Sequence, residues 1–168
     1  NLMQYVVTKV ENGTLIVKIE GSINTMSSID VRVRMSSIAG LESSSGSRIS
    51  SKNTLKGNTI AVKSSSGSEI DTNLEYENVS CESSSGSSIT VSGKALKLET
   101  ASSSGSEIDA DELIANDVYA QATSGSSTTV KPIVKLDGKA SSGSSINYVQ
   151  TPKTITKEET SGGSVDKE

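Results

Sequence analysis

The chain has 168 residues, with 16 Lys and Arg against 20 Asp and Glu and a net charge of -4, and its dispersed basic residues lack the stripe that nucleic-acid binding requires. It contains no His, which removes the usual general base, the commonest metal ligand and any Ser-His-Asp or Cys-His catalytic constellation. No segment approaches the roughly 18 apolar residues of a membrane span. We therefore expect no nucleic-acid partner and no membrane-spanning segment.

The first 40 residues are organised as separate extended segments. Two β-branched runs in residues 5–20 flank Glu11-Asn12-Gly13, a pattern that predicts two strands joined by a tight turn. Residues 28–35 alternate apolar and polar side chains and predict a third strand. We interpret residues 1–40 as the opening coils or cap of a single domain, whose repeats occupy residues 41–168.

Serine-glycine steps recur through the rest of the chain. Their glycines are spaced by 21, 19, 19, 20, 18 and 19 residues, at Gly46, Gly67, Gly86, Gly105, Gly125, Gly143 and Gly162. A flexible linker has no reason to keep a near-constant period, whereas a stacked repeat must place equivalent residues at equal intervals. The Ser-Gly stretches are therefore predicted to be structural corners, in which glycine supplies the unusual backbone dihedrals.

Positions at fixed offsets from these glycines share a chemical character. Three residues after the glycine stand Ile49, Ile70, Ile89, Ile108, Thr128, Ile146 and Val165. Seven residues before it stand Ala39, Ile60, Val79, Leu98, Val118, Leu136 and Ile155. Odd offsets are thus mostly apolar or small and even offsets mostly polar, which is the two-residue period of a strand with one buried face. The serine directly before each glycine has an odd offset, so we expect it to point inward, within a ladder of serine hydroxyls bonded between rungs.

These units of about 19 residues are too small to bury their own apolar face, and they become stable by stacking. We therefore predict an all-β fold, a single-stranded parallel β-helix solenoid, right-handed by expectation, with rungs roughly 4.8 Å apart. The absence of Phe and Trp agrees with a narrow core. The charged residues 156–168 are expected to blunt the C-terminal end.

The order VENGTLIVKI (10–19), IDVRVRM (29–35), recurrent SSSGSxI steps and a closing SGGSV (161–165) resembles the head GIN domain family of autotransporter adhesins over nearly the whole chain. The resemblance implies a parallel β-helix exported to the cell envelope of Gram-negative bacteria, with a role in adhesion. In that family another strand or two precedes the position of Asn1, so we expect a chain trimmed at its start. The resemblance offers no functional residues to carry over.

Carboxylates form the best polar constellation. The sequence SEID occurs twice, and it places Glu69 and Asp71 two rungs, or about 10 Å, from Glu107 and Asp109 on one outer face. Further acids follow on the same coils: Glu75, Glu77, Asp111 and Glu112. An acid pair of a glycosidase type requires a comparable separation of roughly 6.5–9.5 Å in inverting enzymes. We favour the alternative interpretation that these are ordinary polar side chains of a solvated strand face.

The remaining chemistry is sparse. Cys81 lies in an inward column and is interpreted as a small buried hydrophobe, not a reactive thiol. Neither the EF-hand pattern nor GGxGxD repeats occur, and we expect no catalytic residue, no metal ion and no cofactor. Only four tyrosines could stack against a sugar: Tyr5, Tyr76, Tyr119 and Tyr148.

Two functions of different classes remain open. The favoured one is a non-catalytic cell-envelope or surface protein, an adhesin or binding scaffold whose flat faces bind an unidentified protein or glycan. The alternative is a polysaccharide-acting lyase or hydrolase that uses Glu69, Asp71, Glu107 and Asp109, because parallel β-helices host both classes and fold alone does not decide. A groove lined by those acids together with ordered Arg or Lys would favour the enzyme, and a flat face would favour the scaffold.

Overall fold

The computed structural model describes residues 2–21 and 29–168. Two compact units are distinguished by their internal contacts, residues Asn1–Met35 and Ser36–Glu168. The prediction that residues 1–40 form a cap of the same domain stays a prediction.

The first unit contains a β-hairpin. A short 3-10 helix, η1 (Leu2–Tyr5), precedes strands β1 (Val6–Glu11) and β2 (Thr14–Ile19), which pair antiparallel. Asn12 and Gly13 join the strands with φ angles of 49° and 79°. Two successive positive φ angles are what a two-residue hairpin turn requires, and Asn-Gly adopts them most readily. The predicted pair of strands and its tight turn are confirmed.

The third strand predicted for residues 28–35 is wrong for residues 29–35, which form no strand. Residue 28 lies outside the described residues. The alternating side chains satisfy the period of a strand, but a strand also needs a neighbour that takes its backbone hydrogen bonds. Within the described part of the chain, no strand pairs with this segment, and Val31, Val33 and Met35 are 45–51% exposed.

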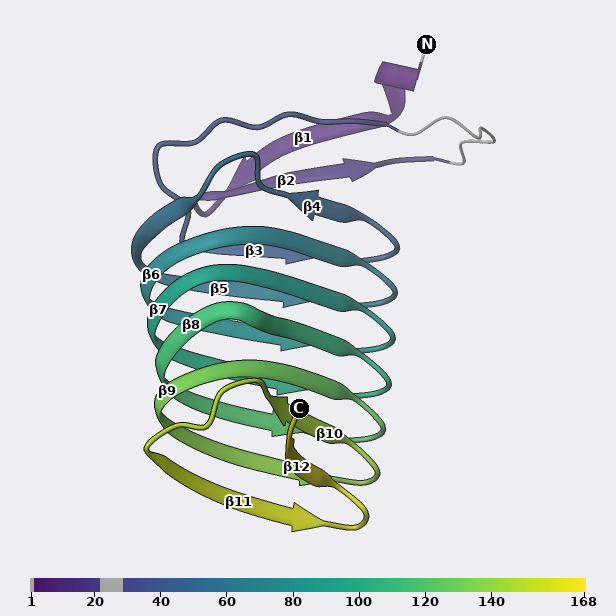
Figure 1. Cartoon of the computed structure of the whole chain (residues 1–168). Coiled ribbons are helices and arrows are strands. Elements are labelled where there is room, and N and C mark those ends of the chain that lie inside the picture. Colours follow the sequence, from purple (N-terminus) through teal and green to yellow (C-terminus); the bar gives the residue numbers. More distant parts are fainter. Residues whose placement is uncertain (1, 22–28) are drawn as a thin grey trace. The chain divides into compact units, whose positions relative to one another are not determined.

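The second unit is a solenoid in which each strand pairs in parallel with the strand of the next rung (Figure 1). Its strands are β3 (Gly40–Ser43), β4 (Arg48–Ser50), β5 (Leu55–Ser64), β6 (Glu69–Ser83), β7 (Ser88–Ser102), β8 (Glu107–Ala122), β9 (Ser127–Ser141), β10 (Ser145–Tyr148), β11 (Thr154–Thr160) and β12 (Ser164–Lys167). They form one ten-stranded sheet that coils through about seven turns roughly 19 residues apart. The predicted all-β parallel solenoid is confirmed.

The buried columns follow the predicted offsets. Ile70, Ile89, Ile108 and Ile146 are 0% exposed and lie in register between adjacent rungs. Thr128 continues this column and is also fully buried. Ile49 is only half-buried and Ala39 is exposed, because both belong to the first rung. The inside-outside assignment of the sequence is therefore confirmed for the central rungs.

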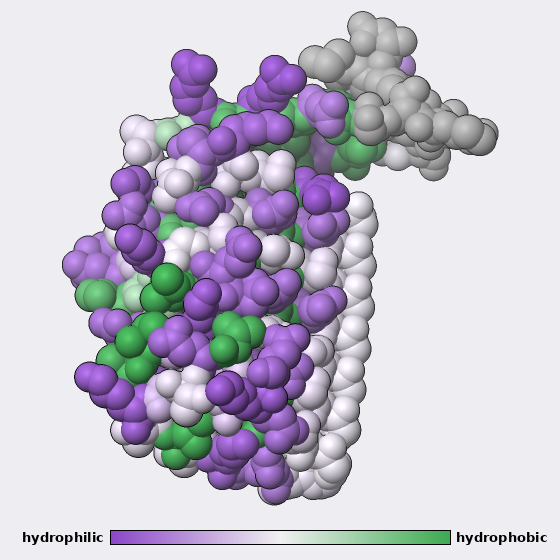
Figure 2. Space-filling model, viewed as in Figure 1, coloured by the Kyte–Doolittle hydropathy of each residue, from purple (hydrophilic) through white to green (hydrophobic). Residues whose placement is uncertain are grey.

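Each Ser-Gly corner is a tight turn, and its serine differs from the prediction. The serines directly before the glycines have φ angles of 49–56° and are exposed, and do not point inward. The turn interrupts the strand alternation, so the inward serines are instead the neighbours of the turn, as Ser64 and Ser68 show with 2% exposure each. Figure 2 shows the corners as a pale column along one edge of the solenoid.

Hydrogen bonds join each corner to the next. The amide of Gly67 donates to the carbonyl of Ser85 at 3.1 Å, and the amide of Gly86 donates to that of Ser104 at the same distance. Inside the corner, the Ser87 hydroxyl donates to the carbonyl of Ser64 on the preceding rung at 2.7 Å. The predicted inter-rung bonding of serine hydroxyls is confirmed, although these hydroxyls bond mainly to backbone carbonyls.

Two buried threonines differ in their bonding. The Thr128 hydroxyl lies 2.8 Å from the Ser102 hydroxyl, which provides its hydrogen bond. The Thr100 hydroxyl has no partner, because its neighbours in the column are Cys81 and Ala120. A buried hydroxyl without a partner loses its bonds to water and gains none in return.

The last rung is closed by charged side chains at inward positions. Lys157 lies over the Tyr148 ring at 5.5 Å and donates to the Val165 carbonyl, while the Val165 amide donates to Glu159 Oε1 at 2.7 Å. The Ser164 amide donates to the Ser144 carbonyl, on the side of β10. Successive residues of a strand direct their backbone groups to opposite sides, so the amide and carbonyl of Val165 face the open edge of the sheet. Side chains thus satisfy the edge groups that another strand would otherwise take. Gly163 fits here because an added Cβ would lie 2.3 Å from the Ala140 carbonyl carbon.

Ile89→Ala is expected to lower the free energy of unfolding by about 2–5 kcal/mol, because it leaves a cavity in the middle of the stack. Ser88→Ala, one residue away on the outer face, is the matched control and should change it by less than about 0.5 kcal/mol. Urea titration followed by circular dichroism measures both. Similar losses in the two variants would contradict the assignment of the faces.

Thr100→Val is expected to raise the free energy of unfolding by about 1 kcal/mol, because it removes a buried hydroxyl without a partner. Thr128→Val makes the same change at a buried threonine that is hydrogen-bonded, and it should lower stability by about 1 kcal/mol. The same titration compares them. If both variants changed the free energy of unfolding in the same direction, the different hydrogen bonding of Thr100 and Thr128 would not account for their effects.

Candidate functional site

The four candidate carboxylates lie as predicted on one outer face, formed by the strand segments that follow the corners. Glu69 is in register with Ser88 and then Glu107, which places the two glutamates two rungs apart. Asp71 and Asp109 are related in the same way through Thr90. We call this surface the acidic face. The predicted register, with the acids two rungs apart, is confirmed, and the neutral Ser88 and Thr90 separate them.

The local partners of these acids do not form an acid-base pair. Glu69 Oε1 lies 3.0 Å from Arg48 Nη2, so this carboxylate is paired within its own column. Burial raises the pKa of Asp109, and repulsion from Asp111 and Glu107 acts in the same direction. The Asp111 amide donates to Asp109 Oδ1 at 3.2 Å and opposes that rise in pKa. The pKa of Asp109 is thus raised by its burial and by neighbouring residues of the same strand, β8. Glu69 and Asp71 do not contribute to this rise.

Two shallow surface hollows of the described residues lie elsewhere, and neither is lined by Glu69, Asp71, Glu107 or Asp109. The four acids lie instead along outward positions of stacked strands. No group of three or more His, Cys, Asp or Glu side chains within residues 2–21 and 29–168 is placed to hold a metal ion.

Cys81 is buried in the inward column between Val62 and Thr100. Complete burial raises the pKa of its thiol to about 12, because the thiolate would have to form in an apolar environment. The prediction that Cys81 is a buried core residue is confirmed, and its raised pKa disfavours the nucleophilic thiolate.

The strand segments that precede the corners form a second outer face with a different charge pattern. Its four lysines are each within 4 Å of a carboxylate of the same face: Lys63 with Glu82 at 2.7 Å, Lys97 with Glu99 at 2.5 Å, Lys135 with Asp137 at 3.9 Å, and Lys139 with Glu158 at 2.8 Å. We call this surface the paired-charge face. Its lysines are balanced locally, and Glu42 and Asp117 add two further carboxylates, so the face presents donors and acceptors but no lysine without a carboxylate partner.

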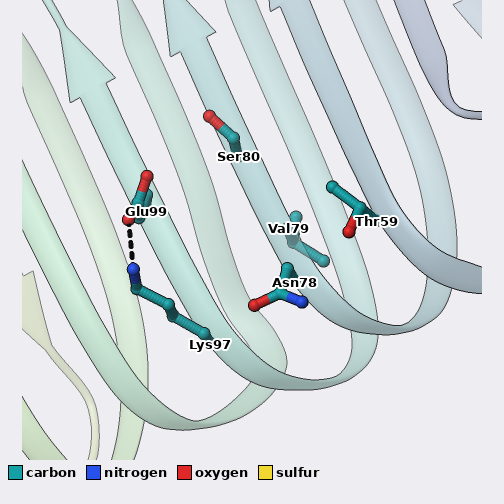
Figure 3. A pocket seen from close by; sticks show the side chains of 6 residues that line it. All are labelled: Thr59, Asn78, Val79, Ser80, Lys97 and Glu99. Atoms are coloured by element: carbon teal, nitrogen blue, oxygen red, sulfur yellow. Dashed lines mark ion pairs between the residues drawn. The ribbon is translucent and has the colours of Figure 1, made fainter.

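The larger hollow, of about 120 Å³, lies on this paired-charge face (Figure 3). It crosses three rungs, from Thr59 on β5 through residues 78–80 on β6 to Lys97 and Glu99 on β7. It is hollow because Ala61 and Ser80 are small where the next rung carries Glu99. Hydroxyl, amide, ammonium and carboxylate groups surround it.

Tyr119 stands on β8 beside this hollow, next to a smaller one of about 60 Å³ that it lines with Ala120, Gln121, Asp137 and Lys139. Lys97 and Lys135, from the rungs on either side, lie 5.0 Å and 4.7 Å from its ring centre. Of the described tyrosines of the solenoid, Tyr76 and Tyr148 are buried, so Tyr119 is the one that faces outward.

Tyr119 was named from the sequence only as one of four tyrosines, although its position relative to Gly125 indicates that it faces outward. Tyr119 lies six residues before Gly125, an even offset, which indicates an outward side chain. Tyr76 also lies at an even offset, ten residues before Gly86, yet it is buried. Two successive exposed residues follow it in β6, so the alternation of buried and exposed side chains shifts by one residue there. The two hollows had no sequence signal, since they depend on which side chains become neighbours across rungs.

None of the helical residues in the described part of the chain forms a segment with the length and hydropathy needed to cross a bilayer.

Comparison with known proteins gives one family and several solved structures. The family model described as "putative auto-transporter adhesin, head GIN domain" matches residues 1–152. No curated protein matches the chain. A "putative adhesin" from Bacteroides fragilis is 16% identical, with a TM-score of 0.92 over 99% of this chain and 78% of that one.

Two structures from Parabacteroides species share the fold at lower TM-scores. A "putative adhesin" from Parabacteroides merdae is 14% identical, with a TM-score of 0.76 over 100% of this chain and 80% of that one. A "putative lipid binding protein" from Parabacteroides distasonis is 20% identical, with a TM-score of 0.74 over the same shares of the two chains. At these identities the likeness shows the fold alone. The family match over residues 1–152, in contrast, shows that the chain belongs to the family described as "putative auto-transporter adhesin, head GIN domain".

Proposed function

We propose that this protein is a non-catalytic adhesin of the cell envelope, which binds a macromolecular partner across several rungs of its solenoid. The observation that carries the proposal is the pair of continuous outer faces, built from strands stacked in register through about seven turns. Such a surface repeats backbone and side-chain groups at intervals of roughly 4.8 Å, so it suits an extended partner more than a small molecule.

Family membership supports both the role and the location. The family is named for auto-transporter adhesins, and two of the structures with the same fold carry the name adhesin. Auto-transporter adhesins act outside the cytoplasm, and we propose that this chain is extracytoplasmic, in the periplasm, on the outer membrane or at the cell surface of a Gram-negative bacterium. The lone Cys81 is compatible with that location because it is buried and unreactive.

The arrangement of the polar groups favours binding over hydrolysis. A catalytic carboxylate pair needs a substrate held between its two members. Here the four candidate acids lie outside both hollows, and Glu69 is engaged by Arg48. A lipid ligand, the class named for one structural neighbour, needs an apolar cavity of roughly 300–1,000 Å³. The larger hollow has only about 120 Å³.

The proposal predicts that the wild-type protein releases no new chain ends from acidic or neutral polysaccharides, while an array of polysaccharides and matrix proteins retains it. A quadruple variant, with Glu69, Asp71, Glu107 and Asp109 all replaced by Ala, should behave alike in the cleavage assay. Reducing-end and unsaturated-product assays measure cleavage, and fluorescence on the array measures retention. Cleavage by the wild type that disappears in the quadruple variant would replace the adhesin proposal with the enzyme.

A further inference from the structure

Resting on the proposed function, we propose that the paired-charge face binds an extended neutral glycan, which lies across β5–β9 with one sugar ring at Tyr119. The charges of this face select the ligand class. A nucleic acid or a polyuronate would need unpaired cations, but Lys63, Lys97, Lys135 and Lys139 are each paired with a carboxylate. A neutral polyhydroxyl ligand needs no net charge, and it bonds to ammonium donors and carboxylate acceptors alike.

The hollows give the ligand its positions. The larger one offers the Asn78 amide, the Thr59 and Ser80 hydroxyls and the Lys97–Glu99 pair, a mixture of donors and acceptors that matches sugar hydroxyls. The smaller one adds the Gln121 amide together with Asp137 and Lys139. Both hollows are shallow, so a chain of sugars lies along the surface and its ends remain outside.

Tyr119 lines the smaller hollow and is in register with Glu99 of the larger one, and its ring lies between the ammonium groups of Lys97 and Lys135. Lys135 Nζ donates to the Tyr119 hydroxyl at 3.4 Å, and the ammonium groups of Lys97 and Lys135 lie near the ring. These contacts hold the ring in place before a ligand arrives, which lowers the entropy that binding costs. Rungs repeat at roughly 4.8 Å, and the sugar rings of an extended β-1,4-linked chain repeat at a similar distance.

The acidic face does not offer the same combination. Its acids Asp71, Glu107 and Asp109 have no ion-pair partner within 4 Å in the described residues, and no outward aromatic stands among them. A ligand on that face would have to be cationic or supply metal ions. The two faces are therefore expected to bind different classes of ligand. A substitution on one face serves as the control for a substitution on the other.

The test measures the dissociation constant for neutral β-1,4-linked hexasaccharides of glucose, mannose and N-acetylglucosamine, and for polyguluronate as the acidic probe, by calorimetry. Three variants are compared with the wild type: Tyr119→Ala, Ser80→Trp, which fills the larger hollow, and Thr90→Trp, which places the same bulk on the acidic face. All three positions face outward, and thermal unfolding checks that each variant folds.

We expect a neutral hexasaccharide to bind the wild type, with at least tenfold weaker binding to Tyr119→Ala and Ser80→Trp and less than a twofold change for Thr90→Trp. Binding of neutral glycans that is lost only in Thr90→Trp, or unchanged in all variants, would overturn the choice of face. Binding of polyguluronate alone, or retention by proteins alone on the array, would overturn the ligand class and leave the adhesin proposal intact. Retention by neither glycans nor proteins would overturn both proposals.

Discussion

The stacked Ser-Gly corner is the constraint on which the rest of the solenoid depends. At each corner a serine adopts a positive φ of about 49–56°, a conformation that costs an L-residue free energy, and the following glycine also has a positive φ. The cost is offset because the glycine amide donates to the next corner, as Gly86 does to Ser104, and because the flanking serine hydroxyls bond to backbone carbonyls. Each corner is thus stabilised by its neighbours, and the register of one rung fixes that of the next.

This register determines what the surface can present. Because the strands on both sides of the corner stack directly, equivalent outward residues form columns, and the chemistry of a face is set by the order of residues within a column. Cross-rung pairs such as Lys63–Glu82 and Lys139–Glu158 form where opposite charges follow one another. In the columns that contain Ser88 and Thr90, Asp71, Glu107 and Asp109 have no ion-pair partner in the described residues, and Glu69 is paired with Arg48. The same backbone therefore carries two faces of different charge, and the proposed binding role depends on that difference.

Most of the fold follows from the period of the sequence, because the offsets of Ile70, Ile89 and Ile108 from their glycines state which residues are buried. The period fails at three places for physical reasons. It places the serine before each glycine inside, although a turn with two positive φ angles interrupts the alternation. It predicts a strand in residues 28–35, although alternation does not supply a pairing partner. It gives no account of the Lys157–Glu159 closure of the last rung or of Tyr119 between its lysines, which depend on contacts between rungs.

Native-state hydrogen exchange of the corner glycines, followed by NMR, tests the central claim most directly, because a linker and a stacked corner differ in their amide protection. The amides of Gly67, Gly86, Gly105 and Gly125 each donate to the carbonyl of the next corner at 3.1 Å. They are expected to exchange only through opening reactions whose free energy approaches that of global unfolding, like the amides of the flanking strands. Exchange of these four glycines at the rate of an unstructured peptide, while the strand amides stay protected, would contradict the account.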